Sequence, residues 1–371
     1  MARITLLGPF WPYRGGIAHF LVAMARGLAR RGHTVRTATF GRQYPETLFP
    51  GKTQLDPGPP PDDVPAAPRW LDTLNPITWV RTARRLGEAD VLVFKYWMSF
   101  FAPAFGTVAR LVRRRGAKVV CVVDNAIPHE RRPGDMALGR YVLGACDGLV
   151  VMSEKVQADV ARLGVEVPVR YVAHPVYDGF GPAVPRDEAR QQLGLPPDAP
   201  VFLFFGFIRR YKGLHVLLDA VPEVVRRVPE AQVVVAGEFY ADEEALRVQA
   251  APLGAVRLDA DYIPDDRVSL YVCAADAVVQ PYVTATQSGV AQIAFHYGRP
   301  VITTDVGGLA EIVPDGEAGL VVPPEDPAAL ADAMARFVED DLGETLAAGV
   351  RRERDRYSWD RLFEAVEDLI A

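Results

Sequence analysis

Residues 201–213 read VFLFFGFIRRYKG, and the run GLHVLLDAVPEVVRRV continues the chain from residue 213. VFLFF is a continuous apolar run that ends at a glycine, which predicts a buried strand of a parallel sheet. The following run repeats apolar residues at helical spacing. A strand that leads into a helix through a short turn is the repeating unit of open α/β sheets. This stretch therefore predicts the fold class, and it places a basic turn at the end of a strand.

The same alternation of strand and helix extends in both directions along the chain. ARITLLG, ADVLVFKYW and AKVVCVVDN are the expected strands of the first half, and AQVVVAG, DAVVQPY and RPVITTD are those of the second. A turn-rich segment, HPVYDGFGPAVP, separates the halves. We therefore expect two doubly wound α/β domains, residues 1–180 and 181–354. The final run YSWDRLFEAVEDLI predicts an amphipathic helix, whose apolar face needs a partner.

Composition and charge narrow the function classes. The 371 residues are 49% hydrophobic and 24% charged, as in a compact globular protein. No apolar run approaches the roughly 18–20 residues that cross a bilayer, so we expect a cytoplasmic protein. The three cysteines are scattered, and no histidine has metal-ligand spacing, so we expect no metal.

Charge is distributed unevenly along the chain. Residues 1–180 have an excess of Lys and Arg, and residues 181–371 an excess of Asp and Glu. Arginine-rich helices are expected at 26–36, 81–85 and 110–118. The pattern suits peripheral contact between the first domain and an anionic membrane or a phosphorylated acceptor, whereas simple solvation of helices is the alternative. We expect no nucleic-acid partner.

Three loops carry candidate site residues. Gly15 and Gly16 precede the first helix, where backbone N–H groups could face a phosphate, although a purely structural turn would read the same way. In GFIRRYKG, the cations Arg209 and Lys212 follow Gly206 and could bind a diphosphate leaving group. A solvated basic turn is the alternative there.

The third loop is TATQSG, residues 284–289, before another helix. Its hydroxyl, amide and backbone N–H groups suit a sugar and its phosphates. Glu311 follows a glycine pair at the end of a neighbouring strand. The candidates in this region are Gln287, Ser288, Gly289, Val290 and Glu311.

Together, these segments resemble the retaining GT-B glycosyltransferases of glycosyltransferase family 4, over essentially the whole chain. The most specific parts are GFIRRYKG and the run GRPVITTDVGGLAEIVPDGEAGLVVPP, residues 298–324. The resemblance implies two Rossmann-like domains, with the final helix, about 355–371, packing back on the first. It implies metal-independent, retaining transfer of a sugar from a UDP- or GDP-linked donor to a glycan, lipid-linked or small-molecule acceptor, in bacterial cell-surface polysaccharide or glycolipid synthesis.

The resemblance also assigns roles to residues. Arg209 and Lys212 match the family's diphosphate-binding pair, Gly15 and Gly16 its first-domain glycine loop, and residues 287–290 its donor loop. Many members carry two glutamates in the donor loop region, but Ala285 and Ile293 occupy those positions here. Glu311 remains as a sugar or ribose contact, and Gln287, Ser288 or Gln292 could supply the missing hydrogen bonds.

The second departure lies in DNAIPHE, residues 124–130. Family members often have a histidine near the reacting sugar at the position of Asp124. An ionised Asp124 could act as a base or orient the acceptor, and Asn125 and His129 could share that task. Two further functions remain open: a catalytically inactive nucleotide-sugar-binding partner of another transferase, and a nucleotide-sugar epimerase.

Overall fold

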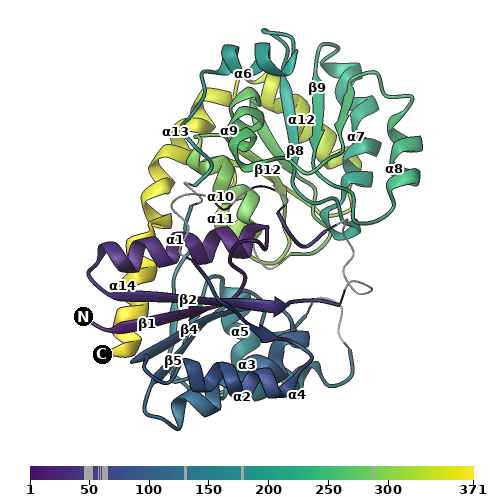
Figure 1. The fold of residues 1–371 in the computed structure, drawn as a ribbon. Helices are drawn as coiled ribbons and strands as arrows, with labels where there is room; N and C mark the ends of the chain where they lie inside the picture. The colour runs from purple at the N-terminus through teal and green to yellow at the C-terminus, as the bar shows by residue number, and fades with distance from the viewer. Residues whose placement is uncertain are drawn as a thin grey trace. The chain divides into compact units, whose positions relative to one another are not determined.

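The computed structural model describes residues 1–45, 53–56, 58, 60, 66–128, 132–176, 179–285 and 288–371. The chain divides into two compact units (Figure 1). The first unit contains Met1–His174 and Ser358–Ala371, and the second contains Pro175–Tyr357. The sequence places the boundary a few residues later, inside the turn-rich segment.

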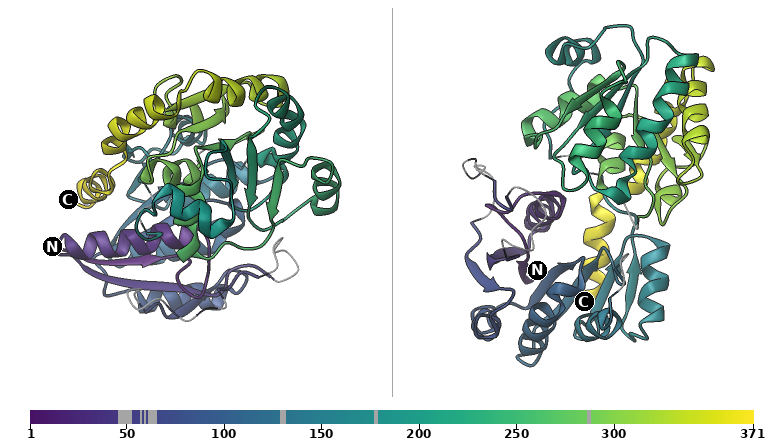
Figure 2. Two further views of the ribbon diagram at one scale, coloured as in Figure 1. Left: turned by 90° about the horizontal axis from the view of Figure 1, so that it is seen from above. Right: turned by 90° about the vertical axis from the view of Figure 1, so that its right-hand side faces the viewer.

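The first unit is a parallel sheet with helices on both faces (Figure 2). Within its described part, seven strands have the order β3-β2-β1-β4-β5-β6-β7, and each pairing is parallel. The strands are β1 (Arg3–Leu7), β2 (Thr34–Arg42), β3 (Arg69–Asp72), β4 (Val91–Tyr96), β5 (Lys118–Val123), β6 (Gly148–Val151) and β7 (Val169–Tyr171). The helices are α1 (Gly16–Arg30), α2 (Pro76–Arg85), α3 (Ala102–Arg113), α4 (Asp135–Leu143), α5 (Glu154–Arg162) and α14 (Trp359–Ile370), with a 3-10 turn at Ser99–Phe101.

The second unit repeats this architecture. Its sheet has six described strands in the order β10-β9-β8-β11-β12-β13, again with parallel pairing. The strands are β8 (Val201–Phe205), β9 (Gln232–Ala236), β10 (Val256–Asp259), β11 (Ala277–Gln280), β12 (Val301–Thr304) and β13 (Gly319–Val322). The helices are α6 (Arg186–Leu193), α7 (Leu214–Arg227), α8 (Glu243–Ala250), α9 (Asp265–Ala274), α10 (Gly289–His296), α11 (Leu309–Ile312), α12 (Pro327–Glu339) and α13 (Gly343–Glu353), with 3-10 turns at Arg210–Lys212 and Arg354–Tyr357.

Each unit has its own hydrophobic core. Every residue of β4 and of β8 is buried, because helices cover both faces of a doubly wound sheet. One cluster of buried apolar side chains lies in the first unit, and a second lies in the second unit. Among the residues that the structure describes, no helix has the length and hydropathy of a membrane span.

The last helix, α14, returns to the first unit. Leu362, Phe363, Val366 and Leu369 are buried, and α14 packs on α1, β5 and β6. A methyl carbon built on Gly27 of α1 would lie 1.9 Å from the Phe363 ring, so only glycine admits this ring. The fold class expected from the sequence is therefore confirmed, including the helix that crosses back.

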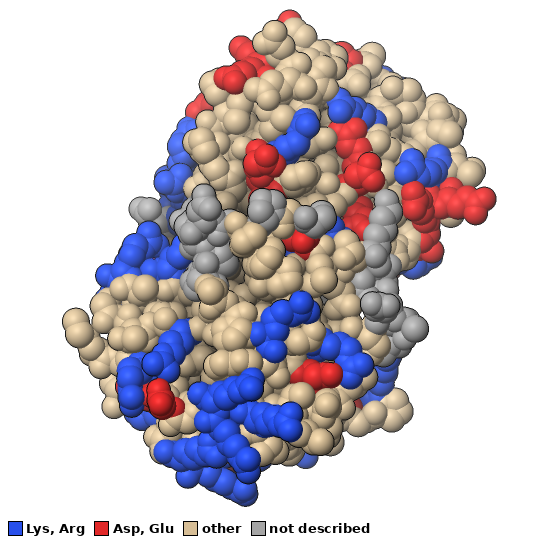
Figure 3. Space-filling view, viewed as in Figure 1, with Lys and Arg blue, Asp and Glu red and all other residues tan. Residues whose placement is uncertain are grey.

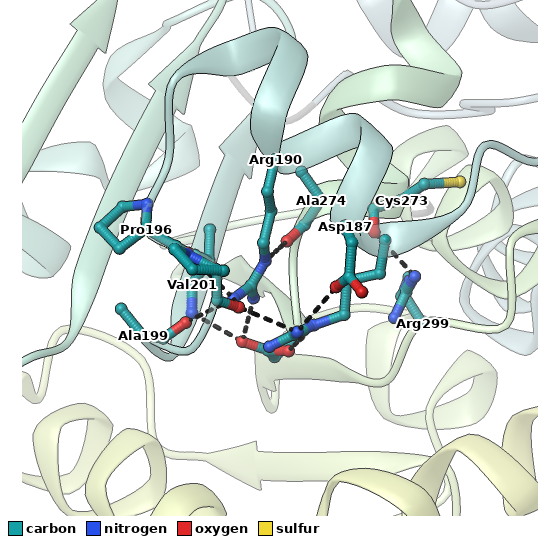
Figure 4. A network of polar contacts seen from close by, with 11 residues as sticks. Asp187, Arg190, Pro196, Ala199, Val201, Cys273, Ala274 and Arg299 are labelled. Atoms are coloured by element: carbon teal, nitrogen blue, oxygen red, sulfur yellow. Dashed lines mark hydrogen bonds and ion pairs between the residues drawn. The ribbon is translucent and has the colours of Figure 1, made fainter.

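A buried arginine joins α6 to the rest of the second unit. Arg190 is 1% exposed, and its guanidinium donates to the carbonyl oxygens of Ala274 and Ala199 and to Asp276 (Figure 4). Asp276 also accepts from the backbone N–H of Val201, the first residue of β8, at 2.7 Å. This network fixes the helix that precedes β8, and so it supports the strand from which the basic turn leaves.

Candidate active site

The strand order of the second unit reverses direction between β8 and β11. β8 and β11 are neighbours, but the chain runs from β8 toward one edge of the sheet and from β11 toward the other. In doubly wound sheets, ligands bind at such a reversal, outside the carboxyl ends of the two strands. Residues 206–213 follow β8 there, and the described residues 281–285 follow β11. Both contain residues that the sequence indicates.

The two loops are in direct contact. The backbone N–H of Val283 donates to the carbonyl oxygen of Tyr211 at 2.7 Å. Gly213 has φ +70°, and a methyl carbon on it would lie 1.8 Å from the Pro281 carbonyl oxygen. Glycine is therefore required on two grounds, the left-handed backbone and the close approach. The contact fixes where the basic turn lies relative to the loop after β11.

Lys212 is the buried cation of this site. It is 8% exposed, and burial, assisted by the nearby charge of Arg209, lowers the pKa of its ammonium to about 7. A methyl carbon built on Gly206 would lie 3.1 Å from Lys212 Nζ and 3.6 Å from Val290 Cγ2. The structure therefore brings together Gly206, Lys212 and Val290. The ammonium makes an ion pair with none of the described carboxylates, whereas an isolated buried charge is costly.

The two arginines of the turn differ in their partners. Arg210 forms an ion pair with Asp242 at 3.4 Å, and its side chain is 77% exposed. Arg209 instead lies over the ring of Tyr240, with its guanidinium carbon 4.9 Å from the ring centroid. Neither Arg209 nor Lys212 makes an ion pair with a carboxylate in the part of the chain that the structure describes. Arg209, and Lys212 in its protonated form, therefore remain available to an anion in this loop.

The loop after β11 ends at the N-terminus of α10. Ser288 is the N-cap residue, and its hydroxyl oxygen accepts from the Ala291 backbone N–H at 3.2 Å. Gln280, the last residue of β11, donates to the same oxygen at 2.7 Å. Burial raises the pKa of Tyr282, whose ring centroid lies 5.7 Å from Lys212 Nζ. Ser288, Gly289 and Val290 therefore place the positive end of α10 beside the loop that carries Lys212.

Other candidates of the second unit lie around this centre. Glu311 lies on the short helix α11, whose Leu309 packs with Tyr282 and Ala285. Ile293 is buried, like Ala285, so both positions that hold glutamates in many family members are part of the core here. Gln292 is fully buried, and neither amide atom has a partner among the described residues. Gln287 lies outside the described residues.

The first-unit candidates fall on two loops. Asp124 follows β5 directly, and its backbone N–H donates to the Tyr96 carbonyl oxygen at 2.8 Å. The Asn125 amide donates to the Trp97 carbonyl oxygen at 3.4 Å. Gly15 is the N-cap residue of α1, with φ +106°, and Gly16 is the first residue of the helix. His129 lies outside the described residues, so its predicted role stays a prediction.

The sequence analysis missed several polar residues near these loops. Lys95, in β4, lies 3.0 Å from Asp124 Oδ1 and is 1% exposed. The signal was a lysine inside the apolar strand VLVFKY, since a charge in a strand buried on both faces needs a partner. Tyr282 and Gln280 were also missed, because an isolated tyrosine or glutamine beside a loop carries no distinctive pattern.

Metal ligands do not gather in the part of the chain that the structure describes. There, no three His, Cys, Asp or Glu side chains lie close enough together to hold a metal ion. Metal independence stays a prediction that needs a direct test.

Comparison with known proteins agrees with the fold and the loops. The profile named "Glycosyl transferases group 1" matches residues 199–340, and "Glycosyl transferase 4-like domain" matches residues 15–176. A D-inositol 3-phosphate glycosyltransferase from Xylanimonas cellulosilytica is 30% identical over 96% of this chain and 91% of its own length. D-inositol 3-phosphate glycosyltransferase 1 from Catenulispora acidiphila is 32% identical over 96% and 90%.

Solved structures share the fold. HepE from Anabaena, in complex with UDP-glucose, is 17% identical, has a TM-score of 0.77 and covers 99% of each chain. At this identity the similarity shows the fold alone, which is GT-B. The two profile matches together cover more than half of the chain, and both relatives align with 96% of it. The chain therefore belongs to the GT-B glycosyltransferases of the glycosyl transferases group 1 family.

Proposed function

We propose that this glycosyltransferase binds the diphosphate of a nucleotide sugar in the second unit and transfers the sugar with retention of anomeric configuration, without a metal ion. The observation that carries the proposal is Lys212, a buried ammonium with no carboxylate partner among the described residues. An anion is the missing partner. A diphosphate at the end of β8 would accept charge-assisted hydrogen bonds from Lys212 and Arg209, worth about 1.5–3 kcal/mol each.

The same groups suit the reaction. As the bond between the sugar and the diphosphate breaks, negative charge increases on the leaving phosphate. Lys212, Arg209 and the N-terminus of α10 are fixed donors on one side of that charge, so they favour the transition state over the intact donor. In this arrangement the cations take the place that a metal ion fills in other sugar transferases. HepE, whose fold is similar, binds UDP-glucose, which makes a UDP-sugar the first donor to test.

The first experiment is a thermal-shift panel with UDP, GDP, ADP, dTDP and their common sugars, run both without and with EDTA. Wild type is compared with Lys212→Ala and with Arg210→Ala. Arg210 is the matched control, because it lies in the same turn but already pairs with Asp242. We expect one nucleotide class to raise the melting temperature of wild type and Arg210→Ala but not of Lys212→Ala. Loss of the shift in EDTA would contradict metal independence, and equal shifts in all three proteins would contradict the Lys212 assignment.

Transfer itself is tested with acceptors of three kinds. The relatives are named D-inositol 3-phosphate glycosyltransferases, so inositol phosphates come first, followed by glycan and lipid-linked acceptors. Proton NMR of the product gives the anomeric configuration, and an inverted product would contradict retention. A nucleotide shift without transfer would favour the inactive binding partner, and a new nucleotide sugar without a glycoside would favour the epimerase.

The acceptor side of the proposal includes contact with an anionic membrane through the first unit. Leu74, Ile77 and Val80 are exposed apolar residues at or near the start of α2, and the exposed Arg81 and Arg84 follow on the same helix. Lys and Arg side chains gather over α2 and α3 in Figure 3. Exposed apolar residues beside basic ones suit insertion at the surface of a membrane that contains anionic lipids.

A further inference from the structure

An internal ion pair lies beside the candidate Asp124 of the first unit. Lys95 Nζ lies 3.0 Å from Asp124 Oδ1, in a geometry that is not aligned as a hydrogen bond. The ammonium also lies 3.2 Å from the centroid of the Phe20 ring on α1. β4 and β5 pair with Lys95 opposite Val122, so Lys95 and Asp124 project from the same face of the sheet. The contact therefore links β4, the end of β5 and the helix that follows the glycine loop.

The two members of the pair differ in accessibility. The Lys95 side chain is 1% exposed, whereas that of Asp124 is 18% exposed. Oδ1 is buried against the ammonium, and Oδ2 accepts no hydrogen bond from the described residues. Only the carboxylate is therefore placed to meet a ligand.

Burial and charge act in opposite directions on this pair. Burial raises the pKa of Asp124, and the Lys95 ammonium opposes that rise. Burial likewise lowers the pKa of Lys95, which the Asp124 carboxylate opposes. The other titratable neighbour on β5 is Cys121, whose thiol pKa burial raises, and from α1 the neighbour is the uncharged Phe20 ring. In each group the charge of the partner favours the ionised form, against the larger effect of burial.

Stability alone does not account for such a pair. Well-packed apolar side chains of similar volume often replace a buried ion pair without loss of stability. β4 is otherwise apolar apart from its final tyrosine, and a methionine at position 95 would suit it. The buried Lys95 is therefore better explained by its effect on its more accessible partner, the Asp124 carboxylate.

We propose that Lys95 is a positioning residue, which keeps Asp124 ionised and turns Oδ1 inward so that Oδ2 accepts a hydrogen bond from a substrate hydroxyl. Lys95 touches no substrate itself, and the inference rests on the proposed function. The hydroxyl belongs to the transferred sugar or to the acceptor, since either would be oriented by a fixed carboxylate oxygen. Without the ammonium, the carboxyl group would be protonated or would turn toward solvent, and the hydroxyl would lose its acceptor.

The test is a double-mutant cycle with three measurements. Lys95→Met, Asp124→Asn and the double variant are compared with wild type in melting temperature, in UDP affinity and in kcat for transfer. Lys118→Met is the matched control, because it removes a lysine from the neighbouring strand, where Lys118 only donates to the Ile370 carbonyl oxygen. Each single variant leaves one buried charge unpaired and should melt at lower temperature, and the double variant should recover most of that loss.

Activity should not recover with stability. We expect kcat to fall about 100-fold in both single variants and in the double variant, the scale of a lost acid–base or orienting group. UDP affinity should stay within about twofold of wild type, because the residues proposed to bind the diphosphate belong to the second unit. The control variant Lys118→Met should keep the kcat of wild type. A double variant that regains kcat together with its melting temperature would overturn the proposal and leave a structural pair.

A failure of the proposed function looks different. If wild type binds no nucleotide and transfers no sugar, the proposed function falls, and the assigned role of Lys95 falls with it. If wild type transfers sugar and Lys95→Met retains its kcat, the proposed function stands and the role of Lys95 alone is wrong.

Discussion

At the scale of single residues, the Lys212 ammonium favours anion binding but lowers the stability of the folded protein. Folding removes it from water without a carboxylate partner among the described residues, and the pKa falls from 10.5 to about 7. A group whose pKa is lower in the folded state destabilises that state below the folded pKa, and the cost disappears as pH rises toward the unfolded pKa. Lys212→Met should therefore raise the free energy of unfolding at pH 6, with an upper bound of about 5 kcal/mol.

Urea unfolding of wild type and Lys212→Met at several pH values measures this effect. The advantage of the variant should shrink as pH increases from 7 to about 10, since wild type then folds with a neutral amine. An advantage that stays constant over this range would show that the substitution acts through packing alone. Arg210→Met, at an exposed and paired position, should show no such trend.

Diphosphate binding should also take up a proton. At pH 8 most Lys212 side chains are neutral in the free protein, because the pKa is about 7. A bound diphosphate stabilises the charged form, so its binding draws up to about one proton from solution. Calorimetry of UDP binding in two buffers of different ionisation enthalpy gives the number of protons. Equal heats in both buffers at pH 8 would contradict the prediction, and Lys212→Met should abolish the difference.

Individual residues were predictable from sequence where an unusual type stands in a loop. Lys212 was found in this way, because lysine is scarce in this arginine-rich chain and this one follows a strand. Lys95 was not found, since its partner lies on another strand and the pairing of β4 with β5 fixes their distance. Arg209 and Arg210 are adjacent in sequence, yet only the structure shows that their partners differ. Arg210 pairs with Asp242, whereas Arg209 lies over the Tyr240 ring.

At the scale of elements, Arg190 holds α6 against the second sheet. Its guanidinium donates hydrogen bonds to the carbonyl oxygens of Ala274 and Ala199 and forms an ion pair with Asp276 at 2.7 Å. Arg190→Met would leave these acceptors buried and unpaired, and we expect a loss of about 3 kcal/mol in the free energy of unfolding. Arg186→Met is the control, because Arg186 pairs with the same Asp276 but is 35% exposed, and it should cost less than about 1 kcal/mol.

Chemical denaturation of the two variants decides the point. Equal losses would mean that the shared carboxylate, rather than the buried guanidinium, carries the stabilisation. The sequence did not predict this network, although it did predict the strands and helices around it. The apolar run of β8 and the helical spacing of α7 were evident, whereas an arginine in RDEARQQL has the pattern of an exposed helix.

At the scale of the whole molecule, the sequence predicted two doubly wound units and the return of the last helix, and the structure has both. Alternating apolar runs carry that information because parallel strands are buried on both faces. The site was less accessible to prediction. The contact of Gly213 with Pro281 joins loops that lie far apart in sequence, and no motif in the sequence indicates that these loops touch.

The uneven distribution of charge gives the prediction for membrane binding. Basic residues near an anionic membrane surface contribute about 1 kcal/mol each, and salt screens this attraction within a Debye length. Replacing both Arg81 and Arg84 of α2 by Gln should therefore lower partitioning onto vesicles of phosphatidylcholine and phosphatidylserine about 30-fold at low salt. Co-sedimentation at increasing salt measures the effect. Replacing Ile77 by Ser should weaken the binding that persists at high salt, because that part comes from burial of apolar surface.

The control must change the net charge equally while leaving α2 intact. Arg226→Gln with Arg351→Gln does so on the second unit, where both side chains are more than half exposed. If membrane contact is made by the first unit, this pair should change partitioning by no more than about threefold. Equal losses in the two double variants would show that net charge alone governs the attraction. Wild type that stays in solution at low salt would contradict membrane contact by the first unit and favour soluble glycan or small-molecule acceptors.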